Sequence, residues 1–202
     1  MKIIDNKKYI IGLFGKYIIS TEFEQNFRKI FKECKFYYLS EYEHYKKIVN
    51  KKIDIVISYG YGVIFKDDFF KKNRSCKIIN MHIGYLPHGR GIYPNMFSII
   101  ENKKCGYSIH LIKNTKIDAG PLLCRKEIFY TNKDTLKTIF DKTKNSLDKF
   151  VSKNLRSIIF KKSKVYFRRH YKYYSRKKGN QYFKKLPRGW NTNIDSLKKI
   201  KF

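Results

Sequence analysis

The chain has 202 residues, of which 42% are apolar, and this suits a single domain with a small appendage and a sizeable core. No apolar run approaches the roughly 20 residues that a membrane-spanning helix needs, so we expect no contact with a membrane. There are 46 lysines and arginines against 16 acidic residues, and the formal net charge is +30 at pH 7. The basic residues are scattered and are mostly lysine, which favours a solvated cationic surface, attractive to phosphate-bearing substrates, and makes nucleic acid an unlikely partner.

The four cysteines have neither the spacing of a metal site nor that of a redox pair. They are Cys34, Cys76, Cys105 and Cys124, and no two of them form a C-x-x-C motif. We therefore expect reduced, mostly buried thiols and no metal site. Reduced thiols are typical of the cytoplasm. The apolar run near the N-terminus is too short for a signal peptide, so we predict a cytoplasmic protein.

Strands and helices alternate along the first sixty residues. The helix that ends near residue 32 has aromatic and aliphatic residues at helical spacing and could be capped by Ser20 or Thr21. The run at 53–58 is apolar except for Asp54, as in a buried parallel strand. The predicted elements are a strand at 9–14, a helix up to 32, a strand at 36–39, a helix at 41–50 and a strand at 53–58.

The alternation continues to residue 160. The predicted elements are a strand at 77–82, a helix at 94–102, a strand at 107–112 and a helix at 134–160. This order predicts an α/β domain over 1–160, with a mostly parallel sheet flanked by helices and ligands outside the carboxyl ends of the strands. From residue 161 the composition shifts to Lys, Arg, Tyr and Asn, so 161–202 is predicted to be a basic aromatic C-terminal extension, either a small appended structure or a mobile segment.

Polar side chains at the end of the strand at 77–82 mark a candidate site. Residues i and i+2 of a strand point to the same face, so Asn80 and His82 project together. Glycines and prolines follow, and a second segment places Asp118 before a Gly-Pro turn. Singly, each of these residues is usually a strand-end hydrogen-bonding group or a turn former. Taken together, they favour a catalytic site.

Two motifs in this order resemble the signature of the folate-dependent formyltransferases. Asn80 and His82 precede a Leu-Pro and an Arg-Gly, and Asp118 begins an Asp-x-Gly-Pro element. The resemblance covers roughly residues 53–123. It implies a Rossmann-like formyltransferase fold with 1–160 as the catalytic domain, 10-formyltetrahydrofolate as co-substrate and no metal. The region before Asn80 is about one strand-helix unit shorter than is usual in the family.

The resemblance also implies roles for individual residues. Formyl transfer needs a hydrogen-bond donor for the developing oxyanion and a route for protons, which Asn80, His82 and Asp118 would supply as catalytic residues. The predicted cofactor-binding residues are Ser58, Tyr59, Gly60, Tyr61, Gly62, Val63, Ile64, Leu86 and Pro87. The predicted substrate-binding residues are Arg90, Gly91, Tyr93, Pro94 and Asn95. His110 is expected to be structural, and His88 to be exposed.

Three branches of the family compete for this sequence. The tRNA branch normally carries a substantial C-terminal RNA-binding domain, and the purine-synthesis branch usually lacks the Arg-Gly-x-x-Pro continuation seen at 90–94. The nucleotide-sugar branch has this continuation, and stacking aromatics such as Tyr182 and Trp190 suit its short appendages. We therefore predict an N-formyltransferase that acts on a nucleotide-linked amino sugar. Methionyl-tRNA or glycinamide ribonucleotide is the alternative acceptor, and the exposed aromatic residues would suit a homodimer.

An alternative of another class is a basic RNA-binding or scaffold protein on a formyltransferase-like frame. It rests on the charge of +30 and on the interleaved aromatic and basic residues at 166–185, where stacking and phosphate contacts could alternate. RNA binding that survives the loss of the three catalytic residues and weakens steeply with salt would favour it. Folate binding without affinity for RNA would exclude it.

Overall fold

The computed structural model describes residues 8–18, 22–160 and 171–200. The strands are β1 (Ile10–Phe14), β2 (Lys35–Leu39), β3 (Ile55–Tyr59), β4 (Lys77–His82), β5 (Arg90–Gly91), β6 (Gly106–Ile112), β7 (Leu122–Glu127) and β8 (Tyr173–Tyr174). The helices are α1 (Glu22–Ile30), α2 (Asp67–Lys72), α3 (Pro94–Ile100), α4 (Leu136–Phe160), α5 (Arg176–Phe183) and α6 (Ile194–Lys199), with 3₁₀ turns η1 (Tyr45–Lys47) and η2 (Gly189–Asn191).

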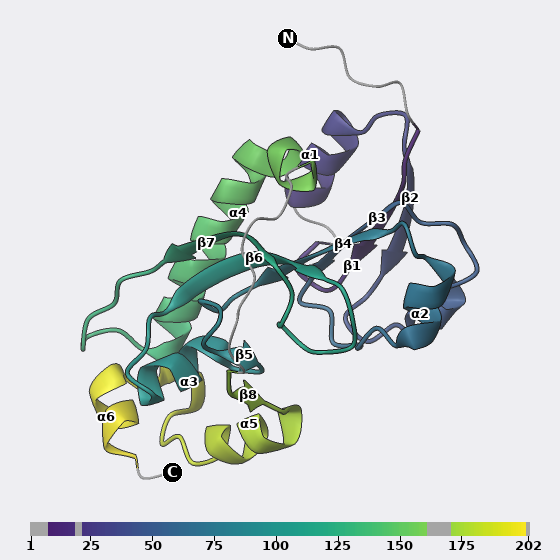
Figure 1. Cartoon of the computed structure of the whole chain (residues 1–202). Coiled ribbons are helices and arrows are strands. Elements are labelled where there is room, and N and C mark those ends of the chain that lie inside the picture. Colours follow the sequence, from purple (N-terminus) through teal and green to yellow (C-terminus); the bar gives the residue numbers. More distant parts are fainter. Residues whose placement is uncertain (1–7, 19–21, 161–170, 201–202) are drawn as a thin grey trace.

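A six-stranded sheet in the order β2-β1-β3-β4-β6-β7 forms the centre of the molecule (Figure 1). The first four strands in this order are parallel to one another, whereas β6 pairs antiparallel with both β4 and β7. The helices α1 and α4 pack on one face, and η1 and α2 pack on the other. This arrangement confirms the predicted α/β fold with a mostly parallel sheet flanked by helices.

The alternation of side chains along β4 carries the predicted polar pair to one face. Ile79 and Met81 are buried in the core under α1 and α4, while Ile78 belongs to the core on the opposite face. Because successive side chains of a strand point to opposite faces, Asn80 and His82 lie on the face of Ile78. The sequence expectation that these two side chains project together is therefore met.

The long helix α4 has the buried stripe that the sequence indicated, whereas in α1 Phe23 and Phe27 are buried but Ile30 is 37% exposed. In α4, Leu147, Val151, Leu155 and Ile158 recur at helical spacing and are buried against the sheet. The predicted cap of α1 at Ser20 or Thr21 lies outside the described residues. None of the helices in the part of the chain that the structure describes is both long enough and apolar enough to cross a membrane.

The predicted helix at 41–50 is wrong, because the backbone there is hydrogen-bonded to other elements. The Glu41 carbonyl accepts from the amide of Gly62 in the loop after β3. Tyr45 is fully buried, and its hydroxyl donates to the Asp68 carboxylate of α2 at 2.6 Å. These contacts leave only the short turn η1, in which His44 caps the backbone amide of Lys46.

The elements α2 and β7 were not predicted. The six residues of α2 are too few to show a clear helical period, although Asp67 and Asp68 in its first turn and two lysines in its last turn suit the helix dipole. β7 directly follows the Asp118 turn. There Gly120 passes so close to β6 that a Cβ atom would lie 1.7 Å from the Leu111 carbonyl oxygen, so this position requires glycine.

Residues 171–200 form a small folded structure that shares a core with the α/β sheet domain (Figure 1). β8 pairs in parallel with β5, and α6 packs on α3. The Tyr174 ring stacks on Phe97 of α3, and Leu186, Ile194 and Leu197 are buried beside it. The described extension is therefore an appended structure that depends on the preceding domain for its core.

All four cysteines are free thiols. Cys105 is buried, as expected, and the other three are only partly buried. Burial and the nearby Glu127 raise the pKa of Cys105 to about 12, so this thiol stays protonated at neutral pH.

Leu197→Ala tests whether the extension and the sheet domain unfold together. Leu197 is fully buried in their shared core, so the truncation should lower the free energy of unfolding by about 2–5 kcal/mol. Urea unfolding followed by circular dichroism should show one cooperative transition at a lower midpoint. Lys198→Ala, at the next and exposed position, is the control and should change little. A separate early transition, with the main one unmoved, would contradict the shared core.

Candidate active site

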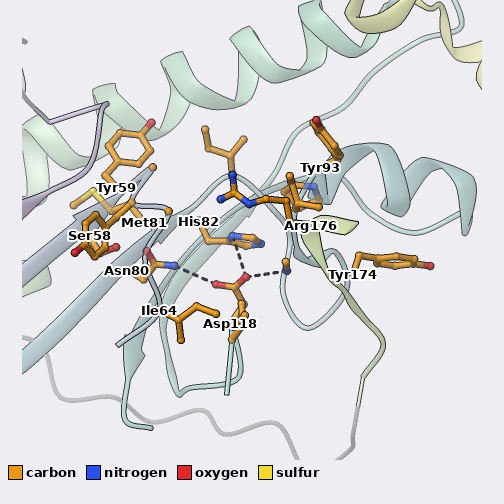
Figure 2. A pocket seen from close by; sticks show the side chains of 18 of the residues that line it. Ser58, Tyr59, Ile64, Asn80, Met81, His82, Tyr93, Asp118, Tyr174 and Arg176 are labelled. Atoms are coloured by element: carbon orange, nitrogen blue, oxygen red, sulfur yellow. Dashed lines mark hydrogen bonds and ion pairs between the residues drawn. The ribbon is translucent and has the colours of Figure 1, made fainter. Parts of the chain in front are cut away.

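A cavity of about 700 Å³ lies at the carboxyl ends of the parallel strands β3 and β4. Its walls are the loop after β3, the end of β4, residues 91–96 around the start of α3, the segment before and at Asp118, and several side chains of the C-terminal extension. This is the position at which ligands bind in open α/β sheets. Figure 2 shows the side chains of Asn80, His82 and Asp118, which line this cavity, pointing toward one another.

Asp118 is 9% exposed and is held by groups from three strands. Asn80 Nδ2 of β4 donates to Oδ1 at 3.2 Å, and the backbone amide of Gly91 in β5 donates to Oδ2 at 2.9 Å. His110 Nε2 of β6 lies 3.3 Å from Oδ1. His82 Nδ1 lies 3.6 Å from Oδ2. The dashed lines in Figure 2 mark contacts of this carboxylate.

These contacts keep the Asp118 carboxyl ionised. Burial by itself would raise the pKa of Asp118, but His82, His110 and the Gly91 amide together lower it well below its usual range. A buried carboxylate with this many partners is a fixed negative charge in the wall of the cavity.

His82 is a neutral imidazole with a defined tautomer. Its Nε2 lies 2.9 Å from the Gly89 carbonyl oxygen, which can only accept, so Nε2 carries the proton. Burial lowers the pKa of His82, and the attraction of Asp118 opposes this only in part. The bare Nδ1 therefore faces the Asp118 carboxylate across 3.6 Å, a distance too long for a direct hydrogen bond. His82 Nδ1 and Asp118 Oδ2 are thus two hydrogen-bond acceptors that face each other. A ligand group that carries hydrogens, placed beside both, could donate to either atom.

The backbone around Asp118 is constrained on both sides. Asp118 has a φ of 47°, in the left-handed region that non-glycine residues seldom occupy. Arg90 donates from Nε and Nη2 to the Ile117 carbonyl at 3.0 and 2.7 Å, and from Nη1 to the Tyr171 carbonyl at 3.0 Å. Arg90 thus ties the Asp118 turn to the extension.

The structure also explains why the second residue of the Arg-Gly motif, Gly91, is a glycine. Gly91 has a φ of 93°, and a Cβ atom there would lie 2.1 Å from the Tyr174 carbonyl oxygen. Only glycine can pair with β8 on one side and donate its amide to Asp118 on the other.

Most of the predicted site residues line one cavity. The three predicted catalytic residues and the whole predicted loop 58–64 lie on its wall. Of the predicted substrate contacts, Gly91, Tyr93, Pro94 and Asn95 line it as well. Asn95, however, is buried, and its side-chain amide is used in contacts with the Gly106 amide and the Thr143 hydroxyl.

The cavity does not reach the remaining three predicted binding residues. Leu86 is fully buried, and its backbone amide donates to the Ser108 hydroxyl. Pro87 lines a separate, smaller cavity together with the partly exposed His88. The guanidinium of Arg90 is occupied by the two backbone carbonyls described above.

Sequence reasoning missed part of the wall and one contact of the carboxylate. The cavity-lining residues that it missed include Lys16, Tyr17, Tyr42, Tyr173, Arg176 and Asn180, while Trp190 was anticipated only as part of an appendage. His110 is 1% exposed, as a structural residue would be, yet it contacts both Asp118 and Asn80. His110 reaches these groups because β6 pairs antiparallel with β4 and places it opposite Asn80. The hydrophobic pattern of a sequence does not show whether two strands pair parallel or antiparallel, so this contact could not be predicted.

The described residues hold no group of three or more His, Cys, Asp or Glu side chains that could bind a metal ion. Candidate cofactor groups are instead the backbone and apolar side chains of the loop after β3. Ile64 of this loop is 49% exposed and lines the cavity, as a contact for a flat, partly apolar ligand would be.

The fold and the site define a Rossmann-like α/β domain with its site at the carboxyl ends of the strands. Comparison with known proteins narrows this class: the model of the formyl transferase family matches residues 20–155. The chain therefore belongs to the formyl transferase family.

Solved structures and curated relatives agree with this assignment. The formyltransferase PseJ from Anoxybacillus kamchatkensis superimposes with a TM-score of 0.77 at 26% identity, over 93% of this chain and 97% of that one. A sugar N-formyltransferase from Shewanella sp. has the same fold, with a TM-score of 0.74 at 22% identity, over 94% and 86%. The methionyl-tRNA formyltransferase of Bacillus thuringiensis is 28% identical over 60% of this chain, but the match spans only 38% of that relative.

The protonation state of His82 can be measured directly. Because burial lowers its pKa, the His82 imidazole should titrate below its ordinary value of 6.5 and carry its neutral proton on Nε2. NMR of the ring nitrogens across a pH series would report both properties, with His82→Asn to assign the signal. A midpoint above 6.5, or a proton on Nδ1, would contradict this description.

The same shift has a consequence for stability. The unfolded chain binds a proton at His82 more readily than the folded protein does, so His82 should lower the free energy of unfolding as pH falls below about 6.5. The decrease should be smaller in His82→Asn over the same pH range, when both proteins are unfolded in urea, and the part that remains includes His88, whose pKa is also lowered by burial.

Proposed function

We propose that this protein is an N-formyltransferase that moves a formyl group from 10-formyltetrahydrofolate to the amine of a nucleotide-linked amino sugar. The observation that carries the proposal is the buried Asp118 carboxylate beside the neutral His82 and the Asn80 amide, in a cavity of about 700 Å³. The structure of the Anoxybacillus PseJ protein holds UDP-4,6-dideoxy-4-formamido-L-AltNAc and tetrahydrofolate. A UDP-linked 4-amino sugar is therefore the first acceptor to test.

We assign the donor to the side of the cavity formed by the loop after β3 and the segment before Asp118. Residues 58–65 line this side together with Ile112 and residues 114–117. A pterin ring could lie between these two segments, with its polar edge on their backbone groups and its face on Val63 and Ile64. The formyl group would then lie beside Asn80, His82 and Asp118.

The proposed chemistry uses the two hydrogen-bond acceptors that face each other, His82 Nδ1 and Asp118 Oδ2. The acceptor amine donates a hydrogen towards His82 Nδ1 or Asp118 Oδ2 while its nitrogen lone pair attacks the formyl carbon. The new N–C bond forms, the carbonyl oxygen becomes an oxyanion that Asn80 Nδ2 stabilises, and the bond from the carbon to folate N10 then breaks. The proton taken from the amine is delivered to N10, so neutral His82 acts first as base and then as acid.

The competing acceptors remain distinguishable by experiment. The sequence match to a methionyl-tRNA formyltransferase and the charge of +30 favour a tRNA acceptor, although the match covers only part of that relative. The extension suits a small acceptor better, because its side chains form a wall of the cavity. Glycinamide ribonucleotide is a third candidate acceptor, whereas a purely RNA-binding role would involve no formyl acceptor at all.

A formyl-transfer assay tests the proposal. Purified protein, 10-formyltetrahydrofolate and single acceptors should give a product heavier by one formyl group with a nucleotide-linked amino sugar, measured by mass spectrometry. Parallel reactions use methionyl-tRNA and glycinamide ribonucleotide. Formylation of either in place of the sugar would replace the proposed acceptor, and failure to bind folate would contradict the whole proposal.

Asp118→Asn and His82→Ala test the proposed roles. Each should lower kcat by roughly 10²–10⁴-fold, because the carboxylate or the proton-transferring group is lost. Folding and folate binding should be retained, as measured by circular dichroism and calorimetry. His88→Ala is the matched control, since His88 lines the separate, smaller cavity. Near-normal turnover of either site variant would rule out the mechanism.

A further inference from the structure

We propose that Arg176 of α5 recognises the diphosphate of the nucleotide-linked acceptor, so that the C-terminal extension selects an amino sugar that carries a nucleotide. This inference rests on the proposed function and assigns one part of the acceptor to one residue. It begins from the distribution of positive charge around the cavity.

Three cationic side chains of the described residues line the cavity, namely Lys16, Lys116 and Arg176. Lys16 forms an ion pair with Glu41 at 2.9 Å, which neutralises its charge. Lys116 belongs to the segment before Asp118, on the side that we assign to the folate. Arg176 belongs to α5 of the extension, outside the two segments that we assign to the folate, and is the cation that we assign to the acceptor.

The guanidinium of Arg176 has no carboxylate among the described residues within ion-pair distance. Its Nη1 donates to the Tyr42 hydroxyl at 3.0 Å, and its Cζ lies 5.3 Å from the centre of the Tyr42 ring. Tyr42 is itself 60% exposed. A guanidinium that rests on a neutral, exposed phenol retains its charge and most of its donors for an anionic ligand.

The Arg176 side chain extends from α5 to the loop after β3. A Cβ atom on Gly62 would lie 3.2 Å from Arg176 Nη2, so the guanidinium lies against this loop although it belongs to the extension. Figure 2 shows Arg176 within the same cavity as His82 and Asp118. An acceptor whose amine approaches Asp118 would therefore have its next groups near Arg176.

The electrostatics of Tyr173 place Arg176 and Asp118 in one region. Burial and the Asp118 carboxylate raise the pKa of Tyr173, while Arg90 and Arg176 oppose this rise. Tyr173 of β8 pairs with Arg90 of β5 in register, next to the Gly91 that donates to Asp118. Both the Asp118 carboxylate and the Arg176 guanidinium therefore act on Tyr173, which lies on the same cavity wall.

An aromatic wall continues from Arg176 along the extension. The Tyr93 ring stacks on Phe183 at 4.7 Å, and Trp190 packs against both rings. Trp190 lines the cavity and is 39% exposed, so part of its indole is available to a ligand. Amine site, guanidinium and aromatic surface would then match the sugar, diphosphate and base of a nucleotide sugar.

A fluorescence titration tests the proposal, because Trp190 is the only tryptophan of the chain and lines this wall. UDP or uridine is added to the full chain and to Arg176→Ala, Arg176→Lys and Lys177→Ala. Lys177 is the matched control, since it is exposed, follows Arg176 in the same helix and does not line the cavity. Folinic acid binding to each variant is measured by calorimetry.

The expected result is a specific loss of affinity for the diphosphate. Arg176→Ala should raise the Kd for UDP at least about tenfold, because a charge-assisted contact to phosphate is removed. Arg176→Lys should recover part of the lost affinity, because lysine partly replaces that contact. The Kd values for uridine and folinic acid should not change in any variant, and Lys177→Ala should bind UDP as the unchanged protein does.

The remaining outcomes separate the two proposals. Equal UDP affinity in Arg176→Ala and the unchanged protein would overturn the role of Arg176, as would a parallel loss of uridine binding. If the unchanged protein bound folinic acid but not UDP, this inference would be wrong while the donor side of the proposed function stood. Binding of neither ligand would overturn both.

Discussion

The burial of the Asp118 carboxylate constrains the rest of the structure. A buried charge is costly unless it is hydrogen-bonded or paired, and the partners here come from β4, β5 and β6. This requires β6 to pair directly with β4, which places His110 opposite Asn80. It also requires a turn in which Asp118 adopts a positive φ and Gly120 packs on β6. The change from parallel to antiparallel pairing in the sheet therefore occurs where the carboxylate needs partners from neighbouring strands.

The same carboxylate couples the extension to the site. Gly91 donates to Asp118 and pairs with β8, and Arg90 holds both the Ile117 and the Tyr171 carbonyls. A shift of the extension would thus disturb the Asp118 turn, and a ligand bound to the extension would stabilise it. Composition suggests a boundary near residue 160, whereas these contacts make residues 171–200 part of the architecture of the site. This arrangement also fits the short region before Asn80, since the extension supplies a wall of the cavity.

The sequence predicted what depends on local pattern. Apolar runs and helical stripes located the long helix α4 and the strands β1, β2, β3, β4 and β6, and the spacing of Asn80 and His82 placed both on one face. The prediction from sequence failed where contacts between distant parts of the chain determine the secondary structure or the burial of a segment. The segment 41–50 has helical composition, but its backbone pairs with the loop after β3. The residues of the extension lack an apolar period because their burial depends on α3, so neither Arg176 nor the place of Trp190 could be read from the chain.

The hydrogen bonds that Asn80 already makes decide how it can act on a substrate. His110 Nδ1 lies 3.1 Å from the Leu111 carbonyl oxygen and so carries a hydrogen. If Nε2 is bare, it accepts from Asn80 Nδ2 at 3.1 Å, the other hydrogen of that amide goes to Asp118, and none remains for an oxyanion. The proposed role of Asn80 therefore requires the substrate oxygen to take the place of His110 Nε2 as acceptor of one Asn80 hydrogen. The second Asn80 hydrogen stays on Asp118 Oδ1 and holds the amide in the orientation that an oxyanion needs.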